Sequence, residues 1–436
     1  MSLMQLTALT AINMIGSGII MLPANMARFG GTSLLSWAVT ALGSMAIAYG
    51  FAQAGVFNTK PGGMAAYAED AYGKDGYFLT FFLYFISLAI GNVAIAISAV
   101  GYLAAFFPWL SSAPIATCIG AIMLIWLTTV ANFGGPGITG KIAAITLCGV
   151  IPVAGLSVIG WLWFSTATFS EAWNPTNLSI AEGAKSGIPL TLWAFLGMES
   201  AAQNSDAVEN PKRSVPLACL LGTLGAAIIY ILSTTVIQGI MPNKDLVESG
   251  SPFAEVYAQM FNPTIGTIIR ALAILACVGS LFGRQFTIAQ TTQAAAGERL
   301  FPAFFAKTNR MSAPVLGMMI LGVVQTILAL STISPSLSDQ FSVLVNLAVV
   351  TYVIPYIISL SALMVIMHNA GVPPSSYRLN TCIALIGMLY STYAIYASGA
   401  TAVIGGAIML AFAFIIWGFL AHRFTSSTIV DLTRFR

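Results

Sequence analysis

Apolar segments of about 20 residues recur along almost the whole chain, and no other sequence feature restricts the fold as strongly. A helix that crosses about 30 Å of hydrocarbon has this length. Of the 436 residues, 58% are hydrophobic and only 7% are charged. A soluble protein carries roughly 25% charged residues, and a disordered chain is more polar than this one. The composition therefore excludes both classes, and most of the protein surface must face lipid.

The apolar segments number twelve and predict an all-α integral membrane protein with 12 transmembrane helices. Helices are expected throughout, because an open β-sheet cannot satisfy its backbone hydrogen bonds in lipid. The predicted spans lie near residues 6–28, 32–57, 80–107, 113–131, 139–164, 185–204, 214–240, 265–296, 314–332, 340–367, 379–397 and 401–421.

The distribution of Lys and Arg predicts that both termini are cytoplasmic. With the N-terminus inside, the inner segments hold twelve of the 17 basic residues, and the outer segments hold Arg28, Lys185 and Lys244. The remaining two, Arg270 and Arg284, fall inside the eighth span. This excess follows the positive-inside rule. The first span has no basic n-region and no cleavage signal, so we interpret it as a retained helix.

Two spans are interrupted at corresponding positions when the first ten are divided into two sets of five. The first span breaks at Gly16-Ser17-Gly18, and the sixth breaks near Gly197. Because five is an odd number, the two halves would insert in opposite directions. Such inverted repeats are typical of transporters that bind their substrate near the membrane midplane. The alternative is that these glycines only allow close helix packing, and the paired breaks favour the transporter.

This symmetry divides the chain into four predicted units. They are the first inverted repeat with helices 1 to 5 (1–165), the second with helices 6 to 10 (185–368), helices 11 and 12 (378–422), and a cytoplasmic tail (423–436).

Glu199 is the one residue among fourteen acids that we expect inside a span. An ionisable group in the membrane costs several kcal/mol unless it faces a cavity or a partner, which indicates a functional role. The structural alternative is a protonated side chain that hydrogen-bonds a neighbouring helix. Arg284 is the one basic residue near the middle of a span, and an arginine keeps its charge. Charge balance therefore predicts a Glu199–Arg284 ion pair, with snorkelling of Arg284 to an interface as the alternative.

The interrupted helices predict a receptor for the head group of an α-amino acid. The break at Ser17 and Gly18 offers unpaired N–H groups and a positive half-helix dipole to a carboxylate. Carbonyl groups near Trp193 and Leu196 can accept hydrogen bonds from an ammonium group. Polar and aromatic residues on other spans are candidates for contact with the substrate side chain, although helix packing is an alternative for each of them. These are Tyr84, Asn92, Trp193 and Asn346. For Trp193, a cation–π contact with a cationic substrate is expected.

Motifs of other protein classes are missing from the sequence. It contains no P-loop, HExxH or GxSxG motif, and its five cysteines form no CxxC pair. The net charge of +3 is too small and too scattered to indicate a nucleic acid partner. We therefore expect no enzymatic activity, no cofactor and no metal, and uphill transport has to use a gradient or an exchange partner. A channel or a non-transporting membrane scaffold is the alternative of a different class.

Four segments resemble the amino acid–polyamine–organocation transporters, and in particular their basic amino acid/polyamine antiporter group. The likeness runs from the first span to about the tenth and fades in the last two. The segments are Asn13-Met-Ile-Gly-Ser-Gly-Ile-Ile-Met-Leu-Pro-Ala-Asn, Gly62-Gly-Met-Ala-Ala-Tyr-Ala-Glu, Trp193-Ala-Phe-Leu-Gly-Met-Glu-Ser-Ala and Glu209-Asn-Pro-Lys-Arg-Ser-Val-Pro.

The resemblance implies a LeuT-like 5+5 inverted repeat with broken helices 1 and 6, often a homodimer, in the inner membrane of a bacterium. It also implies a secondary antiporter that exchanges a cationic amino acid for its decarboxylated amine, with ornithine and putrescine as the first pair. Arginine with agmatine, lysine with cadaverine, or a neutral or other amino acid are the alternatives.

The resemblance and the residue patterns together give a set of candidate site residues. The predicted substrate-binding residues are Asn13, Ser17, Gly18, Tyr84, Asn92, Trp193, Leu196, Glu199, Arg284 and Asn346. Glu199 is in addition the expected proton- or charge-sensing group, and Glu69 is implied in polyamine handling. Arg284 departs from the family pattern, which has a gating tryptophan at this place on helix eight. A fixed cation there repels a diamine and competes with it for Glu199.

Overall fold

The described part of the chain is built from helices, and no strand occurs in it. The computed structural model describes residues 3–58, 63–135, 149–199, 210–334 and 336–432. Its α-helices are α1 (Leu3–Gly18), α2 (Leu22–Ala27), α3 (Ser33–Phe57), α4 (Met64–Leu103), α5 (Pro114–Ala131), α7 (Val150–Ile159), α8 (Thr166–Glu171), α9 (Ile180–Phe195), α11 (Pro211–Ile240), α12 (Asn243–Glu248), α13 (Pro252–Met260), α14 (Pro263–Gly297), α15 (Val315–Ser331), α16 (Leu337–Asn369), α17 (Pro374–Ala397) and α18 (Ala400–Leu432).

Eight helical segments among these residues are long and apolar enough to cross a membrane, which confirms the all-α membrane class. Val150–Leu162 and Val315–Ser331 are shorter apolar helices. The predicted span 139–164 begins, and the span 185–204 ends, outside the described residues. The count of 12 spans therefore stays a prediction. The eight segments are Gly30–Phe57, Met64–Leu103, Pro114–Gly134, Arg213–Ile240, Pro263–Gly297, Leu337–Asn369, Pro374–Ala397 and Ala400–His422.

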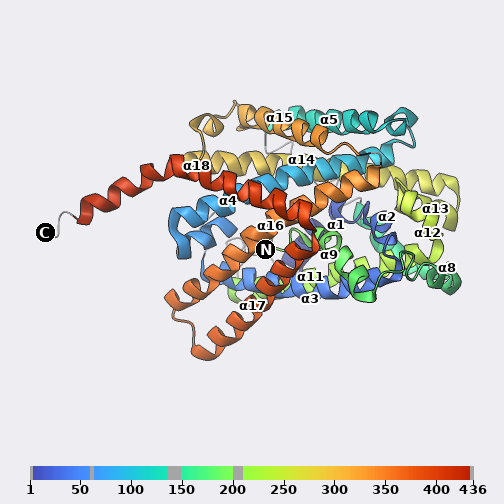
Figure 1. The fold of residues 1–436 in the computed structure, drawn as a ribbon, viewed down its shortest axis with the longest axis horizontal. Helices are drawn as coiled ribbons and strands as arrows, with labels where there is room; N and C mark the ends of the chain where they lie inside the picture. Colours follow the sequence, from blue (N-terminus) through green and yellow to red (C-terminus); the bar gives the residue numbers. More distant parts are fainter. Residues whose placement is uncertain (1–2, 59–62, 136–148, 200–209, 335, 433–436) are drawn as a thin grey trace.

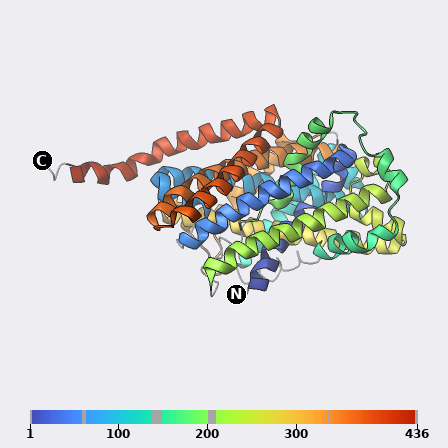
Figure 2. The ribbon, with the colours of Figure 1, turned by 90° about the horizontal axis from the view of Figure 1, so that it is seen from below.

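The long helices run roughly along one direction and form a bundle (Figure 1). Inside it, α4 packs against α16 and α14, and α3 packs against α11, α9 and α17. The short helices α2, α8, α12 and α13 gather at one end of the bundle (Figure 1). The C-terminal part of α18 extends beyond the opposite end (Figure 2).

Local sequence explains where several helices begin. Proline stands in the first turn of α5, α11, α13 and α17, where a missing N–H costs nothing. Ser179 caps α9 by accepting from the Glu182 backbone N–H, and the Glu182 carboxylate accepts from the Ser179 hydroxyl. Gly73 (φ 62°) bends α4 between its first two turns and its long apolar part.

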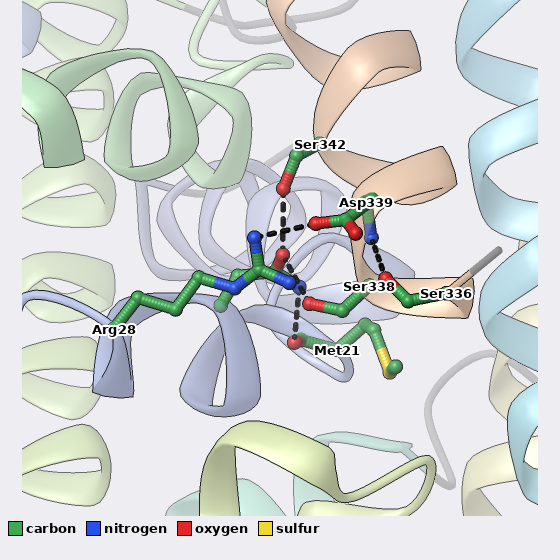
Figure 3. Close-up of polar contacts among 7 residues, drawn as sticks. Met21, Arg28, Ser336, Ser338, Asp339 and Ser342 are labelled. Atoms are coloured by element: carbon green, nitrogen blue, oxygen red, sulfur yellow. Dashed lines mark hydrogen bonds and ion pairs between the residues drawn. The ribbon is translucent and has the colours of Figure 1, made fainter. Parts of the chain in front are cut away.

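Polar side chains tie α2 to the start of α16 at the end of the bundle that holds the short helices. Arg28 forms an ion pair with Asp339, with 2.6 Å between Nη1 and Oδ1. The Oδ1 atom of the fully buried Asn25 accepts hydrogen bonds from Ser338 and Ser342 at 2.8 and 2.7 Å (Figure 3). We call these five residues the α2–α16 clasp. It closes this end of the bundle with contacts between residues more than 300 positions apart in the sequence.

Candidate functional site

Non-helical backbone follows both α1 and α9, while the predicted continuation of the sixth span beyond Glu199 lies outside the described residues. The first break does not include Gly16-Ser17-Gly18 as predicted, because these residues form the last turn of α1, where backbone N–H groups are bonded within the helix. The first lies directly after the Gly-Ser-Gly segment, since α1 includes Gly18 and α2 begins at Leu22. The second follows α9, where Leu196 takes an extended conformation (ψ 128°) and Gly197 has a φ of 110°. A φ of this sign favours glycine. The chain thus leaves the helix at Gly197 without the strain that a larger residue would meet there.

The two interruptions lie against each other in the interior. A Cβ atom on Gly18 would lie 3.4 Å from the Ala194 Cα and 3.8 Å from the Trp193 carbonyl oxygen. Glycine at this position therefore lets α1 approach the end of α9 closely.

Two buried tyrosines satisfy carbonyl groups that the interruptions release. The Tyr102 hydroxyl donates to the Ile20 oxygen at 3.0 Å, and the Tyr230 hydroxyl donates to the Ala194 oxygen at 2.9 Å. Buried backbone oxygens require such partners. Both tyrosines are fully buried, so each interruption has an interior hydroxyl group bonded to a carbonyl beside it.

Glu199 lies two residues beyond Gly197 and is 3% exposed. Its Oε1 accepts a hydrogen bond from the Tyr352 hydroxyl at 2.7 Å, and its Oε2 accepts one from the Tyr356 hydroxyl at 2.7 Å. The Gly197 N–H also donates to Oε2, at 3.2 Å. Hydrogen bonds to an ionised acceptor are short and stronger than neutral ones. Three donors therefore hold one carboxyl group beside the break after α9.

The expected ion pair between Glu199 and Arg284 is not formed among the described residues, and this prediction was wrong. The tyrosines of α16 occupy both carboxylate oxygens instead. The guanidinium carbon of Arg284 lies 5.6 Å from the centroid of the Trp193 ring, a cation–π contact. Charge balance considers only opposite charges as partners. In the structure, two hydroxyl groups are the partners of Glu199, and an aromatic face is the partner of Arg284.

Aromatic contacts connect Glu199 with a pocket. The rings of Tyr84 and Tyr352 make an edge contact at 5.2 Å, and so do those of Tyr352 and Tyr356. Tyr84 is half-buried and belongs to the wall of a pocket of about 320 Å³. The other lining residues are Gly63, Met64, Ala65, Tyr77, Thr80, Phe81, Thr287, Gln290 and Thr291. The rings of Tyr84 and Tyr352 therefore lie between this pocket and the Glu199 carboxylate.

Glu69 belongs to an ion cluster next to this pocket. The Lys74 ammonium group lies 2.9 Å from a Glu69 oxygen and 3.4 Å from a Glu298 oxygen. The same ammonium group lies 5.4 Å from the ring centroid of Tyr77, which lines the pocket. Two carboxylates and an aromatic face thus hold one alkylammonium group at the pocket edge, which is the chemistry that a polyamine requires.

Asn92 lies in a buried amide network. Its Nδ2 donates to the Gln285 Oε1 at 2.7 Å, and Gln285 exchanges hydrogen bonds with Gln325 and donates to Thr129. All four side chains are fully buried. Because Gln285 follows Arg284 on α14, the network fixes the rotation of this helix and directs Arg284 toward Trp193.

Replacing Gln285 by Leu is expected to destabilise the protein. The change keeps the approximate volume but leaves the amides of Asn92 and Gln325 without their partner, at ~1–3 kcal/mol for each buried group. We expect thermal unfolding in detergent at a clearly lower temperature than for Gln290→Leu, a control at an exposed position of the same helix. Equal melting temperatures of the two variants would show that the network does not stabilise the fold.

The remaining predicted residues differ in how they relate to the site. The side chains of Asn13 and Ser17 lie outside the described part of the structure, although their backbone belongs to α1. Leu196 is 5% exposed at the end of α9. Asn346 is half-buried on α16, and within the described residues no hydrogen bond joins it to Glu199 or Arg284.

Sequence reasoning missed Tyr352, Tyr356, Gln285 and Gln325. A signal for the two tyrosines was available, because a spacing of four places both hydroxyls on one face of a helix. For the glutamines, the signal was a pair of amides inside two apolar spans, where each needs a partner. In the described ranges, no group of three or more His, Cys, Asp or Glu side chains is placed to hold a metal ion.

Together these residues form a site suited to a small cationic ligand. A buried carboxylate, several aromatic faces and non-helical backbone meet where α1 and α9 are interrupted. Carboxylate and aromatic faces both attract an ammonium group. Half-helix ends at the centre of a bundle are typical of transporter binding sites.

Comparisons with known proteins agree with this geometry. The amino acid permease family matches residues 1–420. The putrescine transporter PotE of Escherichia coli is 51% identical over 425 residues, 97% of each chain, and the Haemophilus influenzae protein of the same name is 51% identical over 421 residues, 96% of this chain and 97% of that one. A cadaverine/lysine antiporter of Escherichia coli is 35% identical over 359 residues, 81% of this chain and 80% of that one. The chain is therefore a multi-pass membrane protein that belongs to the amino acid permease family, within the amino acid–polyamine–organocation superfamily.

Proposed function

We propose that this protein is a secondary antiporter that exchanges a cationic amino acid for its decarboxylated amine, with ornithine and putrescine as the first pair. The observation that carries the proposal is the buried Glu199 carboxylate, held by two tyrosines beside the interrupted helix. The names of the relatives support it, since they are transporters of putrescine or of cadaverine and lysine. The chain accordingly transports its ligands without changing them and is not an enzyme.

One site can serve both exchange partners because the two molecules share a chain with a distal ammonium group. This group binds near Glu199 and the tyrosine rings, where carboxylate and aromatic faces attract it. We place the α-carboxylate of the amino acid at the non-helical backbone between α1 and α2, directly after Gly18. The amine lacks that carboxylate and keeps only the first set of contacts.

For the arrangement in the membrane, we propose what the sequence predicts. Twelve spans include two inverted repeats, residues 1–165 and 185–368, followed by helices 11 and 12 in residues 378–422. Both termini lie in the cytoplasm, and the protein resides in the inner membrane. The 320 Å³ pocket then faces the cytoplasm, and the α2–α16 clasp faces outside.

Lysine with cadaverine is the second candidate pair. The specific observation is the cadaverine/lysine antiporter among the relatives, at 35% identity. Its substrates are one methylene longer, and a methylene in an apolar pocket changes binding by only ~1 kcal/mol. Competition of labelled ornithine with unlabelled lysine, arginine, their amines and neutral amino acids ranks the candidates.

Counterflow in proteoliposomes tests the exchange itself. Unlabelled putrescine trapped inside is expected to accelerate uptake of labelled ornithine by about tenfold or more over empty vesicles, because each return step then carries a ligand. Protein-free liposomes control for leakage. Uptake that does not respond to internal putrescine or to any other internal amine would contradict antiport and favour a channel or a uniporter.

A further inference from the structure

Arg284 and Trp193 form a stack in the interior that combines three helices. Trp193 is 2% exposed at the end of α9, and the Arg284 guanidinium group reaches its ring from α14. Gly91 on α4 leaves room for this contact. A Cβ atom there would lie 2.9 Å from the Trp193 ring and 3.7 Å from a guanidinium nitrogen. The stack is thus enclosed on the α4 side by a residue without a side chain.

The cation in this stack has no acidic partner among the described residues. Glu199 accepts hydrogen bonds from Tyr352 and Tyr356 and makes no ion pair with Arg284. Arginine cannot lose its charge in a protein. Its N–H donors remain available in a half-buried position. The site therefore contains a permanent positive charge that the carboxylate does not neutralise by direct contact.

Two further polar atoms are buried without a partner in the described part of the chain, one in the stack itself and one on the residue after Gly91. They are the Nε1 of Trp193, a donor, and the Oδ1 of Asn92, an acceptor. Asn92 directly follows Gly91, which contacts the ring. A buried donor and acceptor each gain about 1–3 kcal/mol when they find a partner. The Trp193 indole therefore offers a buried donor to a polar ligand rather than to a hydrocarbon group.

The position of the guanidinium group has different consequences for the two kinds of substrate. It covers a face of Trp193 on which a substrate ammonium group would otherwise stack, and it repels the two charges of a diamine. For an amino acid, the same group is a partner for the carboxylate, since guanidinium and carboxylate form paired hydrogen bonds. One residue thus affects the two exchange partners in opposite ways.

We propose that Arg284 is a specificity-determining residue, a built-in cation on the Trp193 ring that disfavours a bare diamine and favours a substrate with a carboxylate. This inference rests on the proposed function and adds the balance between its two substrates. Because of Arg284, the site binds the amino acid more tightly than the amine. The neighbouring Gln285 is held in the amide network, which fixes Arg284 in place. The preference for the amino acid is therefore a permanent property of the site that needs no change of pH and no other ligand.

Equilibrium binding to the purified full-length protein in nanodiscs tests the proposal. Labelled putrescine and labelled ornithine are titrated against wild type, Arg284→Gln, Arg284→Met and Arg284→Lys. The uncharged variants are expected to bind putrescine about tenfold or more tightly than wild type, because one repulsive unit charge is removed at low dielectric. Ornithine binding gains less or weakens, so the ratio of the two dissociation constants shifts toward putrescine. Arg284→Lys retains the charge and is expected to keep the wild-type preference for ornithine.

Arg270→Gln is the matched control, since it removes the same charge from the same helix. Arg270 lies 14 residues before Arg284 on α14, about 21 Å along the helix, where it donates to Ser251. The Arg270→Gln variant should leave the ratio of the putrescine and ornithine dissociation constants unchanged. An unchanged ratio in both Arg284→Gln and Arg284→Met would overturn the inference while the antiporter proposal stands. If wild type binds neither probe, the proposed substrates fail, and the inference fails with them.

Discussion

The Glu199→Gln variant is expected to lose transport of dications, with the initial rate of putrescine uptake falling about hundredfold or more. Glutamine keeps the shape, and its one oxygen can still accept from one of the two tyrosine hydroxyls, but it removes the negative charge that attracts an ammonium group. Breaking a buried charge pair costs ~3–5 kcal/mol, and ~1.4 kcal/mol corresponds to tenfold in affinity.

Initial uptake rates and dissociation constants for putrescine, measured at several pH values, check this result. Glu255→Gln is a matched control, since it removes one carboxylate from α13, outside the site, where Glu255 accepts from Ser251. Normal putrescine affinity of Glu199→Gln at each pH would reduce Glu199 to a packing residue.

Replacing both Tyr352 and Tyr356 by Phe is expected to have the second largest effect. Each change removes a hydrogen bond to the Glu199 carboxylate, and such bonds to charged groups contribute ~1.5–3 kcal/mol each. Among the described residues, the Gly197 N–H, at 3.2 Å, then remains as the donor. The carboxylate is then buried with little compensation, so we expect a loss of putrescine affinity of about tenfold for each single variant and more for the double variant.

A double-mutant comparison separates this effect from simple loss of packing. In the Glu199→Gln background, the tyrosine substitutions should cost much less, because residues in one hydrogen-bond network are coupled. Tyr49→Phe serves as control, since its hydroxyl donates to Asn380 away from the site. Equal costs in the two backgrounds would mean that the tyrosine hydroxyls do not act through Glu199.

Hydrophobicity predicted the helices, because each apolar segment must be helical in lipid. The breaks were visible as glycines, and Glu199 was visible as an isolated acid. Partners were harder to predict, since a tyrosine in an apolar span has the same pattern as a packing residue. Counting charges paired Glu199 with Arg284, but the structure supplies neutral donors for the first and an aromatic face for the second. Such contacts depend on helix rotation, which the sequence pattern does not determine.

The same limit applies to Asn92 and Gln285. Asn92 was predicted to meet a substrate side chain, and the structure gives its Nδ2 an amide partner on another helix. Four residues from α4, α5, α14 and α15 meet in this network. Each is far from the others in the sequence, so no local pattern identifies the set.

The α2–α16 clasp has a consequence for how often the bundle can open at that end. Its ion pair is partly exposed, with side chains 33% and 47% accessible, and such pairs contribute only ~0–1 kcal/mol. The two serine bonds to Asn25 contribute ~0.5–1.5 kcal/mol each. Together they amount to ~1–4 kcal/mol, so molecules with the clasp released form a minority of roughly 0.1–10% at equilibrium. The clasp by itself therefore does not lock this end of the bundle, and the apolar packing of α2 has to supply the rest of the closure.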